Sequence, residues 1–516
     1  MTDLVLLDGR VYPPDGPPAE ALAVSGGRIS AVGSTVDIAA LAGPATRVIR
    51  LGGRAVIPGL VDSHCHFENA GMDGYTVSFD GVTTIETALE RIAALAATRS
   101  ADGWVLSRLW NPVLQTGRAP DRLELDRAAG GRPVYLPEGH AASVSTAALR
   151  LAGIDPAGHD GRLVEGDVHQ VARFVPEWTV EERAGQMLAA MQVLAGYGIT
   201  SVVAGALPLA DVEVLRSLAE SGRAPVRVAA MVMPTGELNP SVSSAQWREL
   251  LSAGPPKPVG DFLSVRGIKL QIDGGMTLGT AATREGYHTD PEYHGEMFVD
   301  RERLTALVAA AHEYGWPVGT HVVGDAAIDL ALDVYEATRL AGLLPDVLIH
   351  ASMIQPDQIV RARELGVQVA TQLPFLWRNR DAIAGHLGAA RADGAIPLRD
   401  LVDGLGFAGV CAGTDYPVNA LDPWQNIHAM TTRHDVSGRV LGAGQAITRA
   451  EAVDLYTVAG AAHTGEAARK GRLEPGFLAD VTVLDTDPFT AADLRATQAV
   501  LTVTGGRVVH DPGVLD

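Results

Sequence analysis

Cysteine is scarce in this sequence, and so are long apolar runs. The chain has two cysteines among 516 residues, Cys65 and Cys411, so no framework of disulfide bonds holds the fold together. No apolar run is long enough to cross a bilayer. The first residues also lack the basic region and the long apolar core of a signal peptide. We therefore expect a cytoplasmic protein that does not associate with a membrane.

Basic residues are also few relative to acidic ones. The sequence has 41 Lys and Arg against 61 Asp and Glu, a formal net charge of −20. Nothing in that balance offsets the repulsion of phosphate groups, which argues against nucleic acid as a partner. A hydrophobic content of 47% with 20% charged residues is ordinary for a soluble globular protein. The length is sufficient for one large barrel and an accessory domain.

Short apolar runs alternate with helical patterns through most of the chain. Eight runs read as buried strands: 55–63, 199–204, 226–233, 265–272, 317–322, 347–350, 367–371 and 409–414. Apolar residues at helical spacing lie between several of them, as at 304–311 and 328–335. Alternation of this kind is typical of an α/β fold, and eight strands predict a (β/α)8 TIM barrel.

The two ends of the chain resemble each other and differ from the middle. Short apolar runs near both termini are separated by glycine-rich turns. Since chain termini often meet, we expect them to form one small β-sandwich. The interval between the first two barrel strands is too long for one helix and predicts an inserted subdomain. The predicted organisation is a sandwich from 1–54 and 471–516 and a barrel from 55–470, with an insert at about 102–180.

His64 and His66 end the first apolar run and are the most informative feature of the chain. Side chains two apart in a strand point to the same side, so both imidazoles leave the strand end together. Paired neutral imidazoles suit Zn²⁺ or a similar divalent ion. Two histidines alone could equally be ordinary polar residues, so the interpretation requires ligands on other strands.

Further polar residues lie at or near the ends of four other predicted strands. Barrel enzymes place their chemistry at the C-terminal ends of the strands. Each of these residues alone could have a structural role, as an ion-pair partner, a core histidine or a helix cap. Together with the histidine pair they predict a metal site at one mouth of the barrel: Lys269, His321, His350 and Asp415.

Several of these residues lie in motifs that resemble the amidohydrolase superfamily. Within it the chain is similar to the YtcJ-like branch, which includes N-substituted formamide deformylases. The similarity runs through essentially the whole chain. The motifs are Val56–His66, Gly139-His140, Lys269–Gly274, His321–Asp325, Ala412–Pro417 and Leu473–Asp480.

The resemblance implies a metal-dependent hydrolase with one or two divalent ions such as Zn²⁺. The implied ligands are His64, His66, Lys269, His321, His350 and Asp415. Lys269 matches a lysine that, in binuclear members, reacts with CO₂ to form an N6-carboxylated side chain that bridges two ions. Asp415 matches an aspartate that takes a proton from metal-activated hydroxide and passes it to the leaving nitrogen.

Three functions are compatible with these residues. The first is hydrolysis of a C–N bond in a small amide or an N-substituted formamide. The second is hydrolysis of a cyclic imide or carbamate-type substrate, or deamination, on a mononuclear site. Deamination is less favoured because Gly324 occupies the position where superfamily deaminases carry a glutamate. A non-catalytic scaffold, the third, is disfavoured because all six implied ligands are present.

The substrate pocket is less well defined by the sequence. His140, Trp110 and Trp377 are candidate substrate-binding residues because they lie in loops or follow strands. Burial in a core or exposure on the surface is the competing interpretation for each. The resemblance also favours a homodimer, although no motif supports it.

Overall fold

Eight parallel strands form the central barrel of the computed structural model, which describes residues 2–515 except 73, 80, 109, 111, 139, 140 and 165. The strands neighbour one another in chain order. They are β7 (Leu60–Cys65), β12 (Ile199–Pro208), β13 (Arg227–Met233), β14 (Leu263–Gln271), β15 (Val318–Val322), β16 (Val347–His350), β17 (Gln368–Thr371) and β18 (Val410–Ala412). The predicted (β/α)8 barrel is confirmed.

The barrel closes between its last and first strands just beyond β18. The Asp415 amide donates to the carbonyl of His64 at 2.8 Å, and the His66 amide donates to the carbonyl of Tyr416 at 2.8 Å. These two hydrogen bonds bring the ends of β7 and β18 together. Closure therefore places the two histidines beside Asp415.

Helices surround the barrel because their apolar faces pack on the strands. In α10 (Arg301–Glu313), Asp300 caps the first turn, and Leu304, Leu307 and Val308 are buried at the predicted spacing. The other helices around the barrel are α8 (Leu209–Glu220), α9 (Ser244–Leu251), α11 (Asp325–Thr338), α12 (Pro356–Leu365), α13 (Pro374–Leu387), α14 (Ala389–Asp393), α15 (Leu398–Gly409), α16 (Pro423–Thr432), α17 (Arg449–Leu455) and α18 (Val458–His463), whereas α1 (Thr35–Ala39) packs on strands near the N-terminus.

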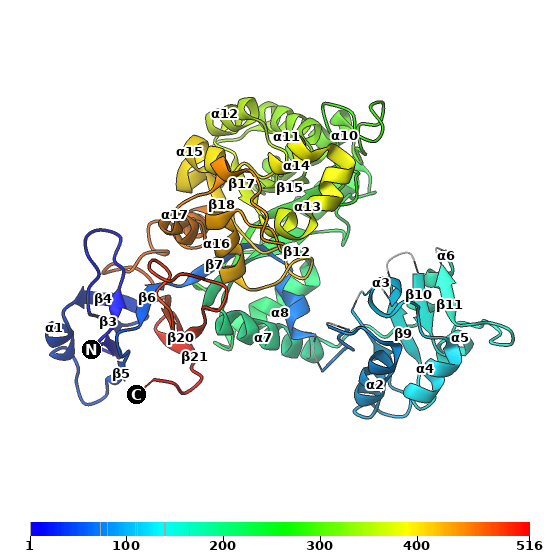
Figure 1. The fold of residues 1–516 in the computed structure, drawn as a ribbon, viewed down its shortest axis with the longest axis horizontal. Helices are drawn as coiled ribbons and strands as arrows, with labels where there is room; N and C mark the ends of the chain where they lie inside the picture. The colour runs from blue at the N-terminus through cyan, green and yellow to red at the C-terminus, as the bar shows by residue number, and fades with distance from the viewer. Residues whose placement is uncertain are drawn as a thin grey trace. The chain divides into compact units, whose positions relative to one another are not determined.

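Strands from both ends of the chain form two further sheets (Figure 1). One has the order β4-β3-β1-β5, and the other has the order β2-β6-β19-β20-β21. A single apolar cluster contains residues of both sheets. Their strands are β1 (Leu4–Leu7), β2 (Arg10–Val11), β3 (Ala21–Ser25), β4 (Arg28–Gly33), β5 (Arg47–Arg50), β6 (Ala55–Pro58), β19 (Val481–Leu484), β20 (Ala499–Thr504) and β21 (Arg507–His510).

The run 55–63, which the apolar pattern predicts as one strand, is two strands in the structure. β6 pairs with β2 and β19 in the terminal sheet, whereas β7 pairs with β12 in the barrel. Gly59 separates them. A Cβ atom at this position would lie 2.2 Å from Oγ1 of Thr200, so only glycine lets the chain pass from one sheet to the other.

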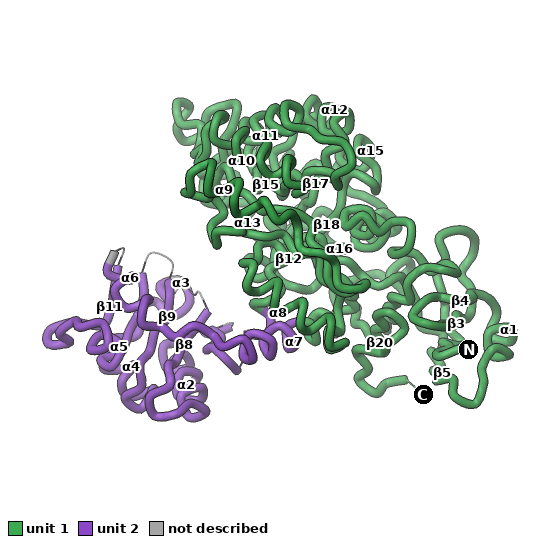
Figure 2. Tube along the Cα trace, turned by 180° about the vertical axis from the view of Figure 1, so that it is seen from behind, with its two compact units in different colours: residues 1–69, 191–516 green, residues 70–190 purple. Residues whose placement is uncertain are grey.

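A second compact unit, residues 70–190, includes the predicted insert (Figure 2). Its sheet has the order β11-β10-β9-β8, from β8 (Val105–Leu106), β9 (Val134–Pro137), β10 (Ala141–Val144) and β11 (Arg162–Val164). Its helices are α2 (Ile85–Ala96), α3 (Pro112–Thr116), α4 (Arg122–Ala128), α5 (Thr146–Leu151), α6 (Gly166–Ala172) and most of α7 (Val180–Gly196). In the described part of the chain, no helix is both long and apolar enough to span a bilayer.

A buried ion pair joins the barrel to the terminal sheets, and we expect its loss to be costly. Arg227 on β13 donates to both carboxylate oxygens of Asp480 at 2.8 and 2.9 Å, and both side chains are almost fully buried. Arg227→Met would leave the Asp480 carboxylate buried without its partner. We expect the free energy of unfolding to fall by about 3–5 kcal/mol in urea denaturation.

The exposed ion pair of Arg495 and Asp493 provides the control. Arg495→Met should cost no more than about 1 kcal/mol, because water screens an exposed pair. Equal losses in the two variants would contradict the role given to Arg227.

Candidate metal centre

The six predicted ligands lie around one cavity of about 460 Å³ at the C-terminal ends of the barrel strands. Each comes from a different position on the barrel rim, at or just beyond the end of a strand. The residues are His64 of β7, His66 just after β7, Lys269 of β14, His321 of β15, His350 of β16, and Asp415 after β18. Closure of the barrel between β18 and β7 therefore brings together residues as far apart as 64 and 415.

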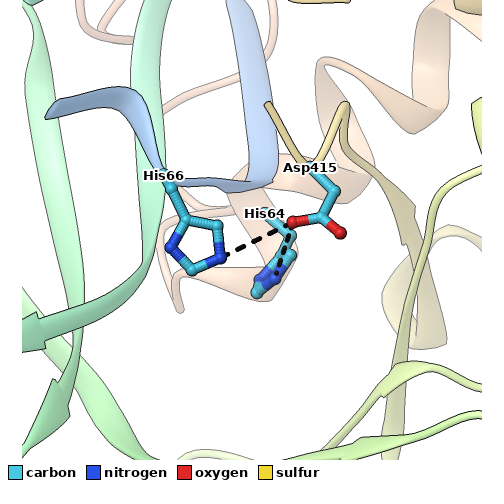
Figure 3. Close-up of side chains that lie close together, drawn as sticks. All are labelled: His64, His66 and Asp415. Carbon is cyan, nitrogen blue, oxygen red and sulfur yellow. Dashed lines mark ion pairs between the residues drawn. The ribbon is translucent and has the colours of Figure 1, made fainter. Parts of the chain in front are cut away.

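Three of these side chains form the tightest group (Figure 3). Nε2 of His64 lies 3.5 Å from Oδ1 of Asp415, and Nε2 of His66 lies 3.6 Å from the same oxygen. One ligand atom from each residue lies within 4.8 Å of the others. Ligand atoms around one Zn²⁺ at about 2 Å lie roughly 3–4 Å apart, so this donor set fits such an ion.

The histidines of the cluster are held neutral. Burial, together with the nearby Lys269 ammonium group, lowers the pKa of His66 to about 4 and that of His321 to about 3. Burial also moves the pKa of His64 and of His350 well below the usual range. A neutral imidazole keeps a lone pair on one ring nitrogen, which is the form that binds a metal ion.

Neighbouring polar groups select which ring nitrogen carries the proton. Nε2 of Gln372 donates to the Ala370 carbonyl at 3.0 Å, so Oε1 faces Nδ1 of His350 at 2.6 Å and accepts a hydrogen bond from it. The proton of a neutral His350 is therefore on Nδ1, and its Nε2 has the lone pair. Nε2 of His321 lies 3.3 Å from the Gly274 carbonyl, which leaves Nδ1 of His321 as the unprotonated nitrogen.

This orientation leads to a prediction for Gln372, which binds no ion itself. Gln372→Leu removes the acceptor for His350 Nδ1 and frees the ring to adopt the other tautomer. We expect metal affinity to fall by about 10–100-fold, measured by competition with a chromogenic chelator. The exposed Gln498 serves as control, and Gln498→Leu should leave the affinity unchanged. Unchanged affinity in a folded Gln372→Leu variant would refute the assignment.

Asp62 joins the two segments that hold the closest ligands. Its Oδ1 accepts from the amides of His64 and Thr414 at 3.2 and 3.0 Å, and its Oδ2 accepts from the Thr414 hydroxyl at 2.6 Å. Thr414 immediately precedes Asp415. One buried carboxylate thus joins the end of β7 to the segment that follows β18.

The backbone around the cluster is crowded and partly strained. A Cβ at Gly205 would lie 2.9 Å from His64 Cε1 and 3.0 Å from His66 Nε2, so glycine makes room for both rings. His350 and Asp415 adopt left-handed backbone angles, with φ of 74° and 55°. Strain of this kind in non-glycine residues gathers at functional sites, which agrees with the position of the cluster.

The remaining wall of the cavity is largely apolar. Lys269 is the only Lys or Arg among its described lining residues. Polar groups come from Gln271, Thr277, Ser352 and Asn379, and the apolar side chains are Leu238, Met276, Leu278, Val323, Phe375 and Val418. A cavity of this composition suits an uncharged group next to the cluster.

The three predicted substrate-binding residues are not among the described residues that line this cavity. Trp377 lies on α13 but lines a different, small cavity, whereas Phe375 and Asn379 of the same helix face the cluster. Trp110 belongs to the second unit, where it stacks on Phe79 with ring centroids 3.9 Å apart. His140 lies outside the described residues. A substrate role for these residues stays a prediction.

Sequence reasoning missed Asp62 and Gln372, although signals for both exist. Asp62 precedes His64 by two residues, so strand alternation places it on the same side as the histidine pair. Gln372 follows β17 directly, and β17, like β12 and β13, contributes none of the six predicted ligands. The rule that identified the other residues would have identified both.

Comparisons with known proteins find relatives that match nearly the whole chain. The chain is 27% identical over 529 residues to a putative amidohydrolase, YtcJ, of Bacillus subtilis, covering 96% of this chain and 97% of that one. It is 26% identical over 542 residues to an N-substituted formamide deformylase of Arthrobacter pascens, covering 98% of each chain.

The fold is similar over nearly the whole chain to that of a crystal structure of an uncharacterized metal-dependent hydrolase from Pyrococcus horikoshii. Its TM-score is 0.78 at 26% identity, with 95% of this chain and 98% of that chain covered. A family model described as the amidohydrolase family matches residues 47–510, which include the whole barrel. The protein is a hydrolase, and the chain belongs to the amidohydrolase family.

Proposed function

We propose that this hydrolase cleaves the C–N bond of an uncharged amide or N-substituted formamide with an apolar substituent. The proposal is carried by the combination of neutral histidines and an aspartate with a cavity whose remaining wall is largely apolar. Similarity to an N-substituted formamide deformylase over nearly the whole chain supports the choice of bond.

Imidazole nitrogens and carboxylate oxygens form a donor set suited to Zn²⁺. His64, His66 and Asp415 would hold one ion, His321 and His350 would hold a second, and carboxylated Lys269 would bridge the two. When bound, such ions make a water molecule nucleophilic near neutral pH and polarise the substrate carbonyl.

Lys269 suits carboxylation because it is buried. Burial lowers the pKa of its ammonium group, which makes the neutral amine accessible near neutral pH. The Nζ lone pair would attack the carbon of CO₂ and release one N–H proton. The product is an anionic carbamate with two oxygens, which replaces a cation that would repel a metal ion.

Asp415 would move protons during the reaction. Burial raises the pKa of its carboxyl group, so the group can both accept and release a proton near neutral pH. It would accept the proton of the attacking water and deliver it to the leaving nitrogen. Delivery is needed because an amine anion is a poor leaving group.

Deamination is less favoured, for a steric reason. A Cβ at Gly324 would lie 1.8 Å from the carbonyl oxygen of Ala282, so no side chain fits at this position. This is where the resemblance to superfamily deaminases would require a glutamate.

A matched substrate panel tests the proposal. The metal-loaded enzyme would be assayed with N-benzyl and N-alkyl formamides and acetamides, each paired with an analogue that carries a carboxylate on the substituent. We expect release of amine and acid, with kcat/KM at least about tenfold higher for the uncharged member of each pair, because the apolar wall offers no partner for a charge. Turnover confined to cyclic imides, or ammonia release from aminated heterocycles, would contradict the proposal.

A further inference from the structure

A second cavity, of about 340 Å³, lies where the barrel strands begin, at the opposite end from the metal centre. Its walls come from the first residues of β12, β13 and β14 and from residues 464–470, which follow α18. The cavity differs from the metal centre in its many charged groups. The charged lining residues are Arg227, Asp261, Arg266, Glu466, Arg469 and Lys470.

Most of these charged side chains form ion pairs with a side chain of opposite charge. Arg469 forms ion pairs with Asp261 and Glu466, and Lys470 also pairs with Glu466. Arg227 is matched by Asp480, as described above. Three of the four cationic side chains therefore have a carboxylate partner.

Arg266 is the exception, and it is 1% exposed. Nε donates to the His463 carbonyl at 2.6 Å, and Nη2 donates to the Pro345 carbonyl at 2.7 Å and to Oε1 of Gln368 at 2.9 Å. All three acceptors are neutral. Among the described residues, Nη1 has no hydrogen-bond partner, and no carboxylate forms an ion pair with the guanidinium.

A buried cation without an ion-pair partner is unfavourable, because a charge loses its hydration in the interior. The Asp346 carboxylate favours the charged form of Arg266, but it forms its contact with His312 and no ion pair with Arg266 among the described residues. Burial lowers the pKa of Arg266 to about 10, the direction expected when the charged form is penalised. Nη1 is shielded from solvent, so Arg266 acts on the cavity through its charge, which is weakly screened there.

Two serines add hydrogen-bonding capacity to the same wall. The hydroxyl of Ser201 is buried and has no partner among the described residues. Ser264 is half-buried and lines the cavity two residues before Arg266. The Ser201 hydroxyl is shielded from solvent like Arg266 Nη1, so Ser264 provides the hydroxyl group that can donate to an anion in the cavity, near the positive charge of Arg266.

We propose that this cavity binds a small anion through a carboxylate or phosphate group, at a site separate from the metal centre. The anion supplies the counter-charge that Arg266 lacks. Bound there, it stabilises the native state, because the cavity exists only when the barrel strands and residues 464–470 are assembled.

Isothermal titration calorimetry on the metal-loaded, full-length protein tests this, with succinate and inorganic phosphate as separate probes. Ionic strength is held constant with chloride. We expect at least one probe to bind, and comparison of the two identifies which head group the site takes. If neither probe binds, the proposal is wrong.

Three variants test whether the anion binds in this cavity. Arg266→Met removes the unmatched charge, and Ser264→Phe fills the cavity while keeping every charge, so each should weaken binding at least tenfold. Should Arg266→Met fail to fold, Ser264→Phe still decides the question. Arg301→Met removes an exposed arginine of α10 and should bind as tightly as the unaltered protein.

His66→Ala separates this cavity from the metal centre, where anions can also bind. Binding that persists in His66→Ala and is lost in Ser264→Phe supports the proposal. Binding that is lost in His66→Ala and unchanged in Ser264→Phe would assign the anion to the metal centre and overturn it. Failure of the amide substrates would leave this result unaffected, since no step here depends on the reaction.

Discussion

Asp415→Asn is expected to lower kcat by about 10²–10⁴-fold while the protein still binds metal. Asparagine has nearly the same shape as aspartate and keeps an oxygen that can face His64 and His66. It cannot accept a proton from the attacking water or deliver one to the leaving nitrogen. The loss should therefore appear in turnover, with little change in metal content by elemental analysis.

Asp403→Asn, at an exposed position of α15, is the matched control and should have normal turnover. Near-normal turnover in a metal-loaded Asp415→Asn variant would refute the proton-transfer role. Loss of metal together with activity would show that the carboxylate is needed mainly to hold an ion.

Lys269→Ala is expected to lose one of two bound ions. The carboxylated side chain would supply one oxygen to each ion, and alanine supplies none. His321 and His350 would then remain as the only side chains proposed for the second ion, too few to hold it firmly. Elemental analysis should find about one ion per chain, and kcat should fall at least about 10²-fold.

The exposed Lys257 provides the comparison, since Lys257→Ala should keep both the metal content and the activity of the unaltered protein. Two ions per chain in a folded Lys269→Ala variant would mean that Lys269 does not bridge two metal ions. The carboxylation of Lys269 would then have to be abandoned.

The barrel could be predicted from the sequence because each strand is a short apolar run between helical patterns. The predicted strands 317–322, 347–350 and 367–371 agree with β15, β16 and β17 to within one residue at each end. The prediction of one strand at 55–63 was wrong for a specific reason. β6 and β7 are both buried and mostly apolar, so the apolar pattern does not show that the chain changes sheet between them. The strand pairing reveals the change, since β6 pairs with β19 and β7 pairs with β12, and the close approach of Gly59 to Thr200 explains why a glycine stands between them.

The cluster was predictable for the same reason as the barrel. Parallel strands end on one rim, so polar residues at those ends converge whatever their separation in sequence. The substrate wall was not predictable in this way. Trp377 and Phe375 lie two apart on α13, and the sequence does not say which of them faces the cavity. That depends on how the helix packs on its neighbours.

The measurement that tests the central claim most directly is metal content per chain, on protein purified without chelators. Six side chains that can bind a metal ion lie together on one rim of the barrel, and a bound ion would explain why they converge there. One ion per chain would keep the metal centre but remove the bridging role of Lys269. Our account predicts two divalent ions per chain, and a protein that binds none, even after metal is added back, would contradict it.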